Sequence, residues 1–346
     1  MKRVFVNGYG SIGSRIAAFL QDDANIEVTG VGKYSPDADV QKALNRGLKV
    51  YAPADRLDRF GASASGSIES ALDSSDMVID ASPGGTGHSN KVSLYDRYGL
   101  PVIYQGGESS SGPGAVSDFI FNSRINYDEA VGRRDAIQGS CNVTGMGRVI
   151  GPLREAYGGH IRRIDVTLVR RWADMEQTDK TFPDSIEMSP NPHHGADARS
   201  YLGDAIPLYV RAVKVPTRQM HLHIMDVRFD GIAPDPSDAH RIFRNERGVA
   251  VLHTAGGTRE VREFAGSMGF HFTDTNMIHI HAAMTASRGD TLQIMYSDDQ
   301  TGIVIPENHM LMQAMLLGVP YDAAAARTES VFGMAERKER LESHFG

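Results

Sequence analysis

The first 140 residues alternate short apolar runs with stretches of helical periodicity. Apolar runs bounded by turn residues predict strands, and the amphipathic stretches between them predict helices. The predicted strands are 3–7, 26–31, 77–81 and 101–105, and the predicted helices are 11–21, 37–46 and 89–98. Strands that alternate with helices are typical of βαβ units on a parallel sheet. We therefore expect a doubly wound α/β domain of the Rossmann type.

The pattern changes near residue 141. Longer alternating runs at 164–169, 208–215, 221–229 and 277–284 predict a mostly antiparallel sheet with one face exposed. The proline-rich segment 182–198 predicts a loop before a short helix, and two more helices are predicted at 310–317 and 323–332. We expect residues 1–140 and 304–346 to form the dinucleotide-binding domain. A mixed α/β catalytic domain, residues 141–303, would be inserted between these two segments.

Composition and charge narrow the class of protein. With 346 residues, two domains, or one domain with a large insertion, are expected. Lys and Arg number 36 and Asp and Glu 43, so the net charge of −7 provides no basic excess for a nucleic-acid partner. No apolar run reaches 18 residues and no signal peptide is recognised, so we expect a cytoplasmic protein without a membrane partner. Cys141 is the single cysteine, which excludes an intrachain disulfide and a multi-cysteine metal site.

A glycine-rich turn follows the first predicted strand. Gly8, Gly10 and Gly13 form the pattern G-x-G-x-x-G, with Ser11 and Ile12 at the start of the next predicted helix. In this pattern the glycines allow a tight turn, a close approach to a pyrophosphate, and close packing of helix on strand. The strand-turn-helix context predicts dinucleotide binding, and the alternative is a purely structural turn.

The end of the second predicted strand selects the cofactor. NAD-binding folds often have an acidic residue here for the ribose 2′-hydroxyl. Lys33 occupies this place, and a cation suits a 2′-phosphate. We therefore expect NADP as the preferred cofactor, with NAD also accepted. The alternative is that Lys33 is a solvated surface lysine.

Cys141 precedes a predicted helix with an apolar face. A thiol at a helix N-terminus is stabilised as a thiolate by the helix dipole, and the nearby N–H groups can hold an oxyanion. The pattern therefore predicts a nucleophile, and the alternative is a small buried apolar residue.

A nucleophilic thiol requires a base, and 13 histidines offer candidates. His221 and His223 alternate on one predicted strand, and His279 and His281 alternate on another, so each pair shares a face. The two pairs could chelate a metal if their strands were adjacent. No carboxylate or cysteine stands at a supporting spacing, so we expect no metal.

Six motifs in order resemble the archaeal-type (type II) glyceraldehyde-3-phosphate dehydrogenases, over nearly the whole chain. They are Asn7-Gly8-Tyr9-Gly10-Ser11-Ile12-Gly13, Tyr104-Gln105-Gly106-Gly107-Glu108, Ser140-Cys141-Asn142-x-Thr144-Gly145, Val169-Arg170-Arg171-x-Ala173-Asp174, His193-His194 and Met220-His221-Leu222-His223. The resemblance implies phosphorylating oxidation of glyceraldehyde 3-phosphate with inorganic phosphate, a step of glycolysis and gluconeogenesis. It also implies a homotetramer.

The resemblance implies residue roles. Cys141 would attack the aldehyde, His221 would be its acid/base partner, and Asn142 and the Cys141 amide would be oxyanion donors. A thiohemiacetal would lose hydride to the nicotinamide, and phosphate would release the resulting thioester as an acyl phosphate. Lys33 falls on the family's 2′-phosphate lysine, and Asn308 would hold the nicotinamide amide.

For the phosphate groups the resemblance implies Arg170, His193 and Thr144, and it leaves Arg171 and His194 as alternatives to the first two. The chain also departs from the family. Val143 stands where a threonine is usual, and Arg218-Gln219 precede the M-H-x-H motif. These departures leave the aldehyde open. The rival functions are an acyl-phosphate-reducing semialdehyde dehydrogenase of amino-acid synthesis and a non-catalytic NADP-sensing protein.

Overall fold

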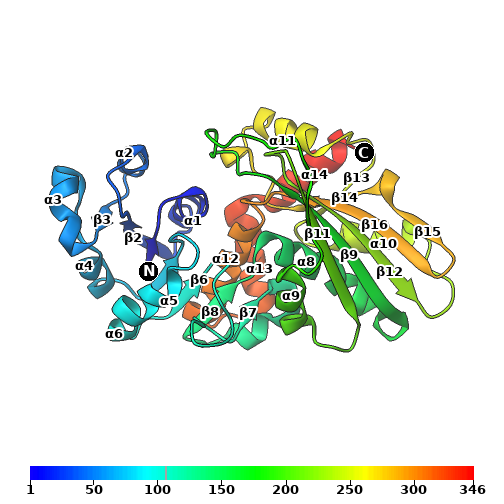
Figure 1. The fold of residues 1–346 in the computed structure, drawn as a ribbon, viewed down its shortest axis with the longest axis horizontal. Coiled ribbons are helices and arrows are strands. Elements are labelled where there is room, and N and C mark those ends of the chain that lie inside the picture. Colours follow the sequence, from blue (N-terminus) through cyan, green and yellow to red (C-terminus); the bar gives the residue numbers. More distant parts are fainter. Residues whose placement is uncertain (106) are drawn as a thin grey trace. The chain divides into compact units, whose positions relative to one another are not determined.

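The computed structural model describes residues 1–105 and 107–346 and divides into two compact units (Figure 1). The first unit consists of Met1–Gly139 and Ile305–Phe332, and the second of Ser140–Val304 and Gly333–Gly346. Gly106, within one of the family-like motifs, lies outside the described residues. The first segment ends beside the position at which the hydrophobic pattern changes.

A parallel sheet forms the centre of the first unit. Its strands are β1 (Lys2–Asn7), β2 (Ile26–Gly32), β3 (Val50–Ala52), β4 (Gly66–Ser67), β5 (Met77–Asp80), β6 (Val102–Tyr104), β7 (Ile120–Phe121) and β8 (Asp135–Gln138). The order is β4-β3-β2-β1-β5-β6-β8-β7, and the neighbouring strands are parallel. The order reverses between β1 and β5, where such sheets bind ligands beyond the strand ends. The expected Rossmann-type α/β class is confirmed.

The helices of the first unit are α1 (Ser11–Gln21), α2 (Ala38–Asn45), α3 (Leu57–Phe60), α4 (Ile68–Asp73), α5 (Gly87–Asn90), α6 (Asp96–Tyr98), α7 (Ser123–Asn126), α12 (Val304–Met312) and α13 (Tyr321–Phe332). Among them, α1, α2 and α13 match the segments predicted at 11–21, 37–46 and 323–332, whereas the helix predicted at 310–317 begins earlier, at Val304. Short 3₁₀ turns are η1 (Ala54–Arg56), η2 (Gly61–Ser63) and η4 (Tyr127–Ala130), and π-helical turns are η3 (Lys91–Tyr95) and η8 (Gln313–Leu317). The single helix expected at 89–98 is thus three segments, because a π-helical turn separates α5 from α6.

Buried polar contacts attach α12 and α13 to the first unit. The carboxylate of Glu307 accepts hydrogen bonds from the backbone N–H and the hydroxyl of Ser123, both at 2.8 Å. Asp23, which is 2% exposed, receives His309 Nε2 at 2.8 Å and Arg327. Burial alone would raise the pKa of Asp23, but the hydrogen bonds from these two partners hold it well below its usual value. Residues 305–332 therefore belong to the same unit as the N-terminal sheet.

The last helix, α14 (Met334–His344), departs from the expectation that all of 304–346 joins the N-terminal domain. It belongs to the second unit. Gly333 has a φ of 60°, a left-handed conformation that ends α13 and turns the chain. Glu342 accepts a hydrogen bond from the backbone of Val251 at 2.9 Å, and Arg337 donates to Asn276 at 2.7 Å. These contacts are made by charged side chains on a helix of low apolar content, so hydrophobic periodicity did not reveal them.

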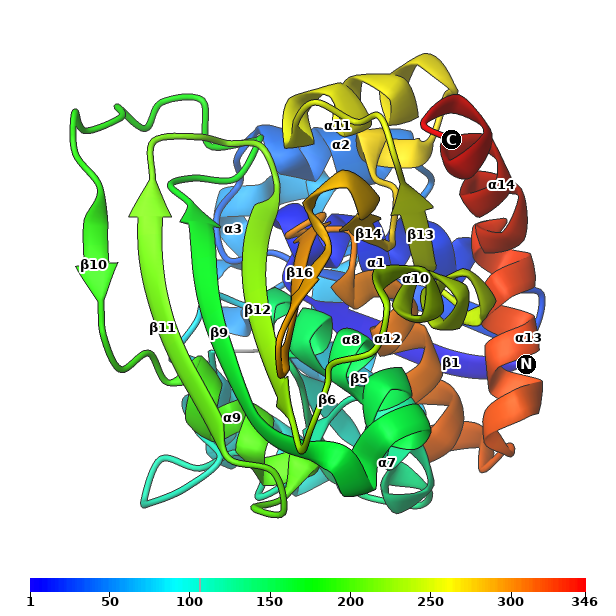
Figure 2. The same cartoon turned by 90° about the vertical axis from the view of Figure 1, so that its right-hand side faces the viewer.

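A mixed sheet forms the centre of the second unit (Figure 2). Its strands are β9 (Ile161–Arg171), β10 (Glu187–Ser189), β11 (Leu208–Val215), β12 (His221–Phe229), β13 (Val249–Leu252), β14 (Ile278–His281), β15 (Ala286–Arg288) and β16 (Thr291–Asp298). The order is β10-β11-β9-β12-β16-β14-β13, and β15 pairs with β16. The pairs β9–β11 and β13–β14 are parallel, and the other pairs are antiparallel, which confirms a mostly antiparallel sheet.

The second unit also contains helices, one of which packs against the mixed sheet. They are α8 (Cys141–Tyr157), α9 (His194–Leu202), α10 (Pro236–Asn245), α11 (Thr258–Ser267) and α14, with the 3₁₀ turns η5 (Gly158–His160), η6 (His271–Thr273) and η7 (Ala282–Met284). Helix α8 packs against β9 and β16. On β12, alternate residues beginning at His221 are buried, whereas those between them are more exposed. The buried face of β12 therefore presents both of its histidines to the protein interior.

No helix within residues 1–105 and 107–346 combines the length and the apolar character needed to cross a membrane.

Candidate active site

The glycine-rich turn joins β1 to α1 in the first unit. A Cβ atom on Gly8, whose φ is +118°, would lie 2.3 Å from the carbonyl oxygen of Ala81. A Cβ atom on Gly13 would lie 2.1 Å from the carbonyl oxygen of Gly8, whereas one on Gly10 would meet no atom of the described residues within 4 Å. Gly8 and Gly13 are therefore required by close packing within the protein. The open space at Gly10 suits the approach of a ligand pyrophosphate.

The N-terminus of α1 has the features of an anion site. The helix begins at Ser11 and Ile12, and its N-cap, Gly10, has no side chain that could accept a hydrogen bond from the first turn. The first turn also contains no acidic residue. Helix N-terminal N–H groups and the helix dipole favour a negative group at such an end. These residues fit the pyrophosphate of a dinucleotide.

Lys33 follows β2, but it is not the solvated lysine of the alternative interpretation. It is 8% exposed, and its Nζ lies 2.8 Å from the carboxylate of Asp37 and 3.8 Å from that of Asp39. Asp37 also caps α2 by accepting the N–H of Asp39. A 2′-phosphate at Lys33 would therefore have to compete with a carboxylate for the same ammonium group. The position of Lys33 in the sequence did not indicate this competition.

Asn308, on α12, is buried in the first unit and forms an amide pair with Gln105. Gln105 Nε2 donates to Asn308 Oδ1 at 2.7 Å, and Asn308 Nδ2 donates to Gln105 Oε1 at 3.1 Å. Gln105 follows β6 and belongs to one of the family-like motifs. To hold a nicotinamide amide, Asn308 would have to share or exchange this partner.

Cys141 is the first residue of α8, with Ser140 as the N-cap. The expected position at a helix N-terminus is therefore confirmed. The thiol is half-buried, and Asn142 Nδ2 lies 3.7 Å from Sγ.

His221 is the first residue of β12 and is 1% exposed. Met220, directly before it, has a φ of 28°, a backbone conformation that is rare for a non-glycine residue. The backbone N–H of Arg171 on β9 donates to Nδ1 of His221 at 3.1 Å, and Nε2 has no hydrogen-bond partner among the described residues. Because Nδ1 is an acceptor, the neutral ring carries its proton on Nε2.

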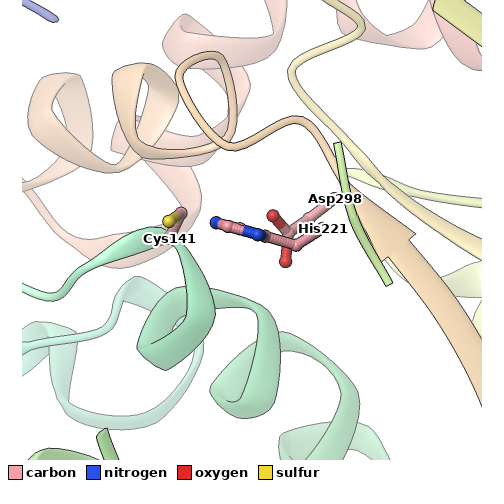
Figure 3. Close-up of side chains that lie close together, drawn as sticks. All are labelled: Cys141, His221 and Asp298. Carbon is pink, nitrogen blue, oxygen red and sulfur yellow. The ribbon is translucent and has the colours of Figure 1, made fainter. Parts of the chain in front are cut away.

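Asp298, the last residue of β16, lies directly opposite His221 in the β12–β16 pair. The sulfur of Cys141, a ring nitrogen of His221 and a carboxylate oxygen of Asp298 all lie within 4.8 Å of one another. Figure 3 shows the ring of His221 pointing toward the sulfur, with the carboxyl group of Asp298 beside the ring. The second unit thus brings together a thiol, an imidazole and a carboxyl group.

Asn142 connects this cluster to two further histidines. Its Oδ1 accepts from His223 Nε2 at 3.0 Å, and its Nδ2 lies 3.3 Å from His194 Nε2. His223 therefore fixes the amide so that the NH₂ group faces Cys141 and His194. Since Nε2 of His194 accepts this bond, the neutral ring carries its proton on Nδ1, which has no partner among the described residues. The amide of Asn142 is oriented as a donor next to the sulfur.

The two arginines of the R-R pair have different surroundings. Arg171 is paired with the carboxylate of Asp174. Arg170 is two residues from Leu168 on β9 and so shares the buried face of the sheet with it. The Nε atoms of both arginines are buried without a partner among the described residues. Its charge also acts on the thiol of Cys141. Of the two, Arg170 is the guanidinium available to a substrate anion.

The H-H pair is divided in the same way. His194 is 2% exposed and bonded to Asn142, whereas the side chain of His193 is 62% exposed and lies 3.9 Å from Asp197. The rings stack at 4.1 Å. Thr144 is fully buried in the first turn of α8. The structure therefore brings His194 into the cluster and leaves His193 at its edge.

Burial disfavours the charged forms of these groups. Desolvation, and next the charge of Asp298, raise the pKa of Cys141 to about 12. Desolvation lowers the pKa of His221 well below its usual value and the pKa values of His194 and His223 to about 3. It also raises the pKa of Asp298 well above its usual value. Desolvation thus opposes the thiolate that the helix N-terminus was expected to favour.

The hypothesis of a metal held by two H-x-H pairs fails on topology. Strand β16 lies between β12 and β14, so the pairs are not on adjacent strands. His281 Nε2 and His279 Nδ1 are instead within hydrogen-bond distance of the hydroxyl of Ser297, at 3.0 and 3.3 Å. The two pairs are therefore independent of one another.

Curated proteins provide the comparison that identifies the family. The chain is 33% identical to the glyceraldehyde-3-phosphate dehydrogenase of Pyrobaculum arsenaticum, over 98% of this chain and 99% of that protein. It is 34% identical to that of Haloarcula marismortui, over 91% of this chain and 89% of that protein. It is also 34% identical to glyceraldehyde-3-phosphate dehydrogenase 2 of Methanosarcina barkeri, over 91% and 92%. The chain belongs to the archaeal-type glyceraldehyde-3-phosphate dehydrogenases. No protein-family model matches it.

Members of this dehydrogenase family use a nicotinamide dinucleotide. In this member, no pattern in the sequence pointed to Asp298, and His223 stood only as a candidate base or metal ligand. The alternation of His223 with His221 was a signal for a shared face. Asp298 and Asp299 end an alternating run, but nothing in the sequence indicates that β16 pairs with β12 or which residues lie opposite each other.

Proposed function

We propose that this chain catalyses the NAD(P)-dependent, phosphorylating oxidation of glyceraldehyde 3-phosphate to 1,3-bisphosphoglycerate. The observation that carries the proposal is the approach of the Cys141 sulfur, a His221 nitrogen and Asp298 to within 4.8 Å of one another at the N-terminus of α8. A thiol beside a proton-transferring group is the arrangement that covalent catalysis on an aldehyde requires. The family membership supports the same reaction.

In the proposed reaction, the sulfur of Cys141 adds to the aldehyde carbon and forms a thiohemiacetal. A bound nicotinamide dinucleotide supplies the acceptor for the hydride that this adduct then loses. The resulting thioester is attacked by phosphate, which releases an acyl phosphate and regenerates the thiol. His221 is the acid/base partner, and a positioned group of this kind contributes about 10²- to 10⁴-fold to the rate.

Two sets of donors complete the proposed catalytic site. The NH₂ group of Asn142, oriented by His223, and the backbone N–H of Cys141 stabilise the oxyanion of the adduct. Arg170 and the Nδ1–H of His194 bind phosphate oxygens, and Thr144 and His193 are more remote candidates. Because His194 is neutral, it acts as a hydrogen-bond donor and adds no charge.

We assign dinucleotide binding to the first unit and catalysis to the second. The cofactor contacts are the G-x-G-x-x-G turn with Ser11 and Ile12, Lys33 at the 2′-phosphate, and Asn308 at the nicotinamide. The pairing of Lys33 with Asp37 supports the use of both NAD and NADP, because it reduces the positive charge offered to a 2′-phosphate. The assembly carried over from the family is a homotetramer, which light scattering of the purified protein would test.

The reduction of NADP and of NAD is measured with glyceraldehyde 3-phosphate, with and without inorganic phosphate. The proposal expects turnover that requires phosphate. Aspartate and glutamate semialdehydes serve as competing substrates, and preferential turnover of either would establish the rival function in amino-acid synthesis.

The variant Cys141→Ser separates an enzyme from an NADP-sensing protein. It is expected to abolish turnover and to leave the dissociation constant for NADP unchanged, since the thiol and the glycine-rich turn belong to different units. Wild-type protein that binds NADP yet oxidises none of the three aldehydes would refute the enzymatic function.

A further inference from the structure

We propose that Tyr95 is a positioning residue of the dinucleotide site. Its buried hydroxyl ties the end of β1 to the end of β5 and thereby holds the glycine-rich turn in the conformation that binds the cofactor pyrophosphate. The inference rests on the proposed function for the assignment of dinucleotide binding to the first unit. It adds a residue that lies outside the six family-like motifs and acts on the cofactor through its neighbours.

The two residues that Tyr95 connects lie where the strand order of the parallel sheet reverses. Asn7 and Asp80 are the last residues of β1 and β5, and they are direct partners in the pairing of these strands. The glycine-rich turn begins immediately after Asn7, and its Gly8 packs closely against the carbonyl oxygen of Ala81. Ligands of doubly wound sheets bind beyond such a pair of strand ends. The conformation of both strand ends therefore determines the shape of the cofactor site.

The hydroxyl of Tyr95 bridges the two strand ends. The side chain is 1% exposed, and its hydroxyl donates to Asp80 Oδ2 at 2.8 Å. Because the hydroxyl proton is used in this bond, the oxygen is available as an acceptor, and Asn7 Nδ2 donates to it at 2.6 Å. Burial raises the pKa of Tyr95 well above its usual value, so the hydroxyl keeps its proton and remains a donor.

The carboxylate of Asp80 extends the network into the segment that follows β5. Its Oδ1 accepts the backbone N–H of Ser82 at 2.9 Å, and its Oδ2 accepts Asn90 Nδ2 at 3.0 Å in addition to Tyr95. Asn90 Nδ2 also lies 3.0 Å from the hydroxyl of Ser82, which lies 2.8 Å from that of Thr86. Three donors thus converge on one buried carboxylate, and residues 82–86 are held against the end of β5.

The amide of Asn7 extends the network in the other direction. Its Nδ2 also donates to the hydroxyl of Tyr34 at 2.9 Å, and Tyr34 directly follows Lys33. Asn7 is fully buried and pairs with Gly32, the last residue of β2. A Cβ atom on Gly32 would lie 2.2 Å from Asn7 Oδ1, so the amide fills the space that a side chain would need. The network therefore crosses the carboxyl ends of β2, β1 and β5.

A break in helical geometry precedes the bridging residue. Tyr95 is the last residue of η3, the π-helical turn between α5 and α6. A π-helical turn contains more residues than an α-helical turn, which changes the direction of the side chains that follow, and such turns are frequent at functional sites. In this chain the turn interrupts the helix expected at 89–98, and the residue at its end is the one that reaches both strands.

The network lowers the cost of binding and adds no contact of its own. The backbone N–H groups of the glycine-rich turn would hold the pyrophosphate, and their direction depends on the ends of β1 and β5. A turn that is already held in the bound conformation loses less conformational entropy when the cofactor binds. Because NADP and NAD share the pyrophosphate, we expect loss of the bridge to weaken the binding of both by the same factor.

The test measures the dissociation constants of NADP and NAD for Tyr95→Phe by fluorescence titration of the full chain, together with the Tm. The substitution is expected to raise both constants by the same factor, about 3- to 30-fold. In the enzymatic assay the KM for each cofactor should rise in parallel, whereas kcat should change less than about twofold, since the reacting groups belong to the second unit.

Tyr104→Phe is the matched control. Tyr104 is also fully buried, its ring centroid lies 6.2 Å from that of Tyr95, and its hydroxyl has no hydrogen-bond partner among the described residues. Both variants remove one buried phenolic oxygen, but only Tyr95 connects two strands. Tyr104→Phe is expected to leave both dissociation constants unchanged. Equal weakening in the two variants, or a lower Tm of Tyr95→Phe with unchanged constants, would indicate a structural role and overturn the proposal.

A double-variant cycle tests whether Tyr95 acts through Asn7. In an Asn7→Ala background the hydroxyl of Tyr95 no longer connects the strand ends, so Tyr95→Phe is expected to raise the dissociation constants by a smaller factor than in the wild-type background. The same factor in both backgrounds would mean that the bridge does not position the turn, and the proposal would fail.

Failure of the proposed function is distinguishable from failure of this inference. Wild-type protein that binds neither NADP nor NAD would refute the assignment of dinucleotide binding to the first unit. Wild-type binding combined with unchanged dissociation constants in Tyr95→Phe would refute the inference alone.

Discussion

The protonation state of Cys141 allows a quantitative prediction. The thiol pKa of about 12 leaves a thiolate fraction of about 1 in 10⁵ at pH 7. Free cysteine, with a pKa of about 8.5, has a fraction of about 3 in 100. The folded protein should therefore contain about 3,000-fold less thiolate than an unfolded chain at the same pH.

Intrinsic nucleophilicity offsets part of this difference. A more basic thiolate reacts faster with a disulfide, with a Brønsted coefficient of about 0.4–0.5, so a shift of about 3.5 pKa units recovers about 40-fold. The net expectation is a reaction about 10²-fold slower in the folded, ligand-free protein. The half-buried position of the sulfur can only slow it further.

The assay follows the release of thiol from a small aromatic disulfide at pH 7. The same protein unfolded in urea provides the reference, because Cys141 is the single cysteine and every reaction reports on it. If the folded protein reacts as fast as the unfolded protein or faster, the sulfur is a stabilised thiolate. Desolvation would then not outweigh the helix dipole at Cys141.

Three further predictions concern separate parts of the chain. Asp37→Ser should strengthen NADP binding relative to NAD binding by about 5- to 10-fold, since a screened ion pair is worth about 1 kcal/mol. Lys33→Ala should weaken NADP binding relative to NAD binding. Fluorescence titration with both cofactors measures the ratio of the dissociation constants, and equal effects on the two cofactors would refute the role of Lys33. Asn142→Ala should lower kcat by about 10²- to 10³-fold, as expected for a lost oxyanion donor. The pH dependence of kcat/KM should change little. Asp23→Asn should lower the free energy of unfolding by about 3 kcal/mol at pH 7. Because its partners lower the pKa of Asp23 in the folded state, this contribution is present above about pH 4 and is lost as the pH falls. Urea unfolding at pH 7 and pH 3 should show that the difference in the free energy of unfolding between wild type and variant shrinks at the lower pH. A constant difference would contradict the ion-pair role.

Local features of the chain were predictable from the sequence because they depend on near neighbours. The glycines at 8, 10 and 13 follow a strand and open a helix, and the steric contacts of Gly8 and Gly13 arise within this same supersecondary unit or its neighbouring strand. Cys141 begins a helix because an apolar periodicity starts directly after it. The alternation of His221 and His223 requires only the two-residue period of a strand.

Only the tertiary structure decided which distant groups meet and what charge they carry. The pairing of His221 with Asp298 depends on the register of two strands whose residues are far apart in sequence, and hydrophobic alternation does not specify a partner strand. The protonated state of Cys141 depends on its desolvation by the surrounding fold, and the attachment of α14 to the second unit depends on polar contacts after Gly333. Period and propensity are properties of short segments. Burial, register and charge coupling are properties of the packed chain.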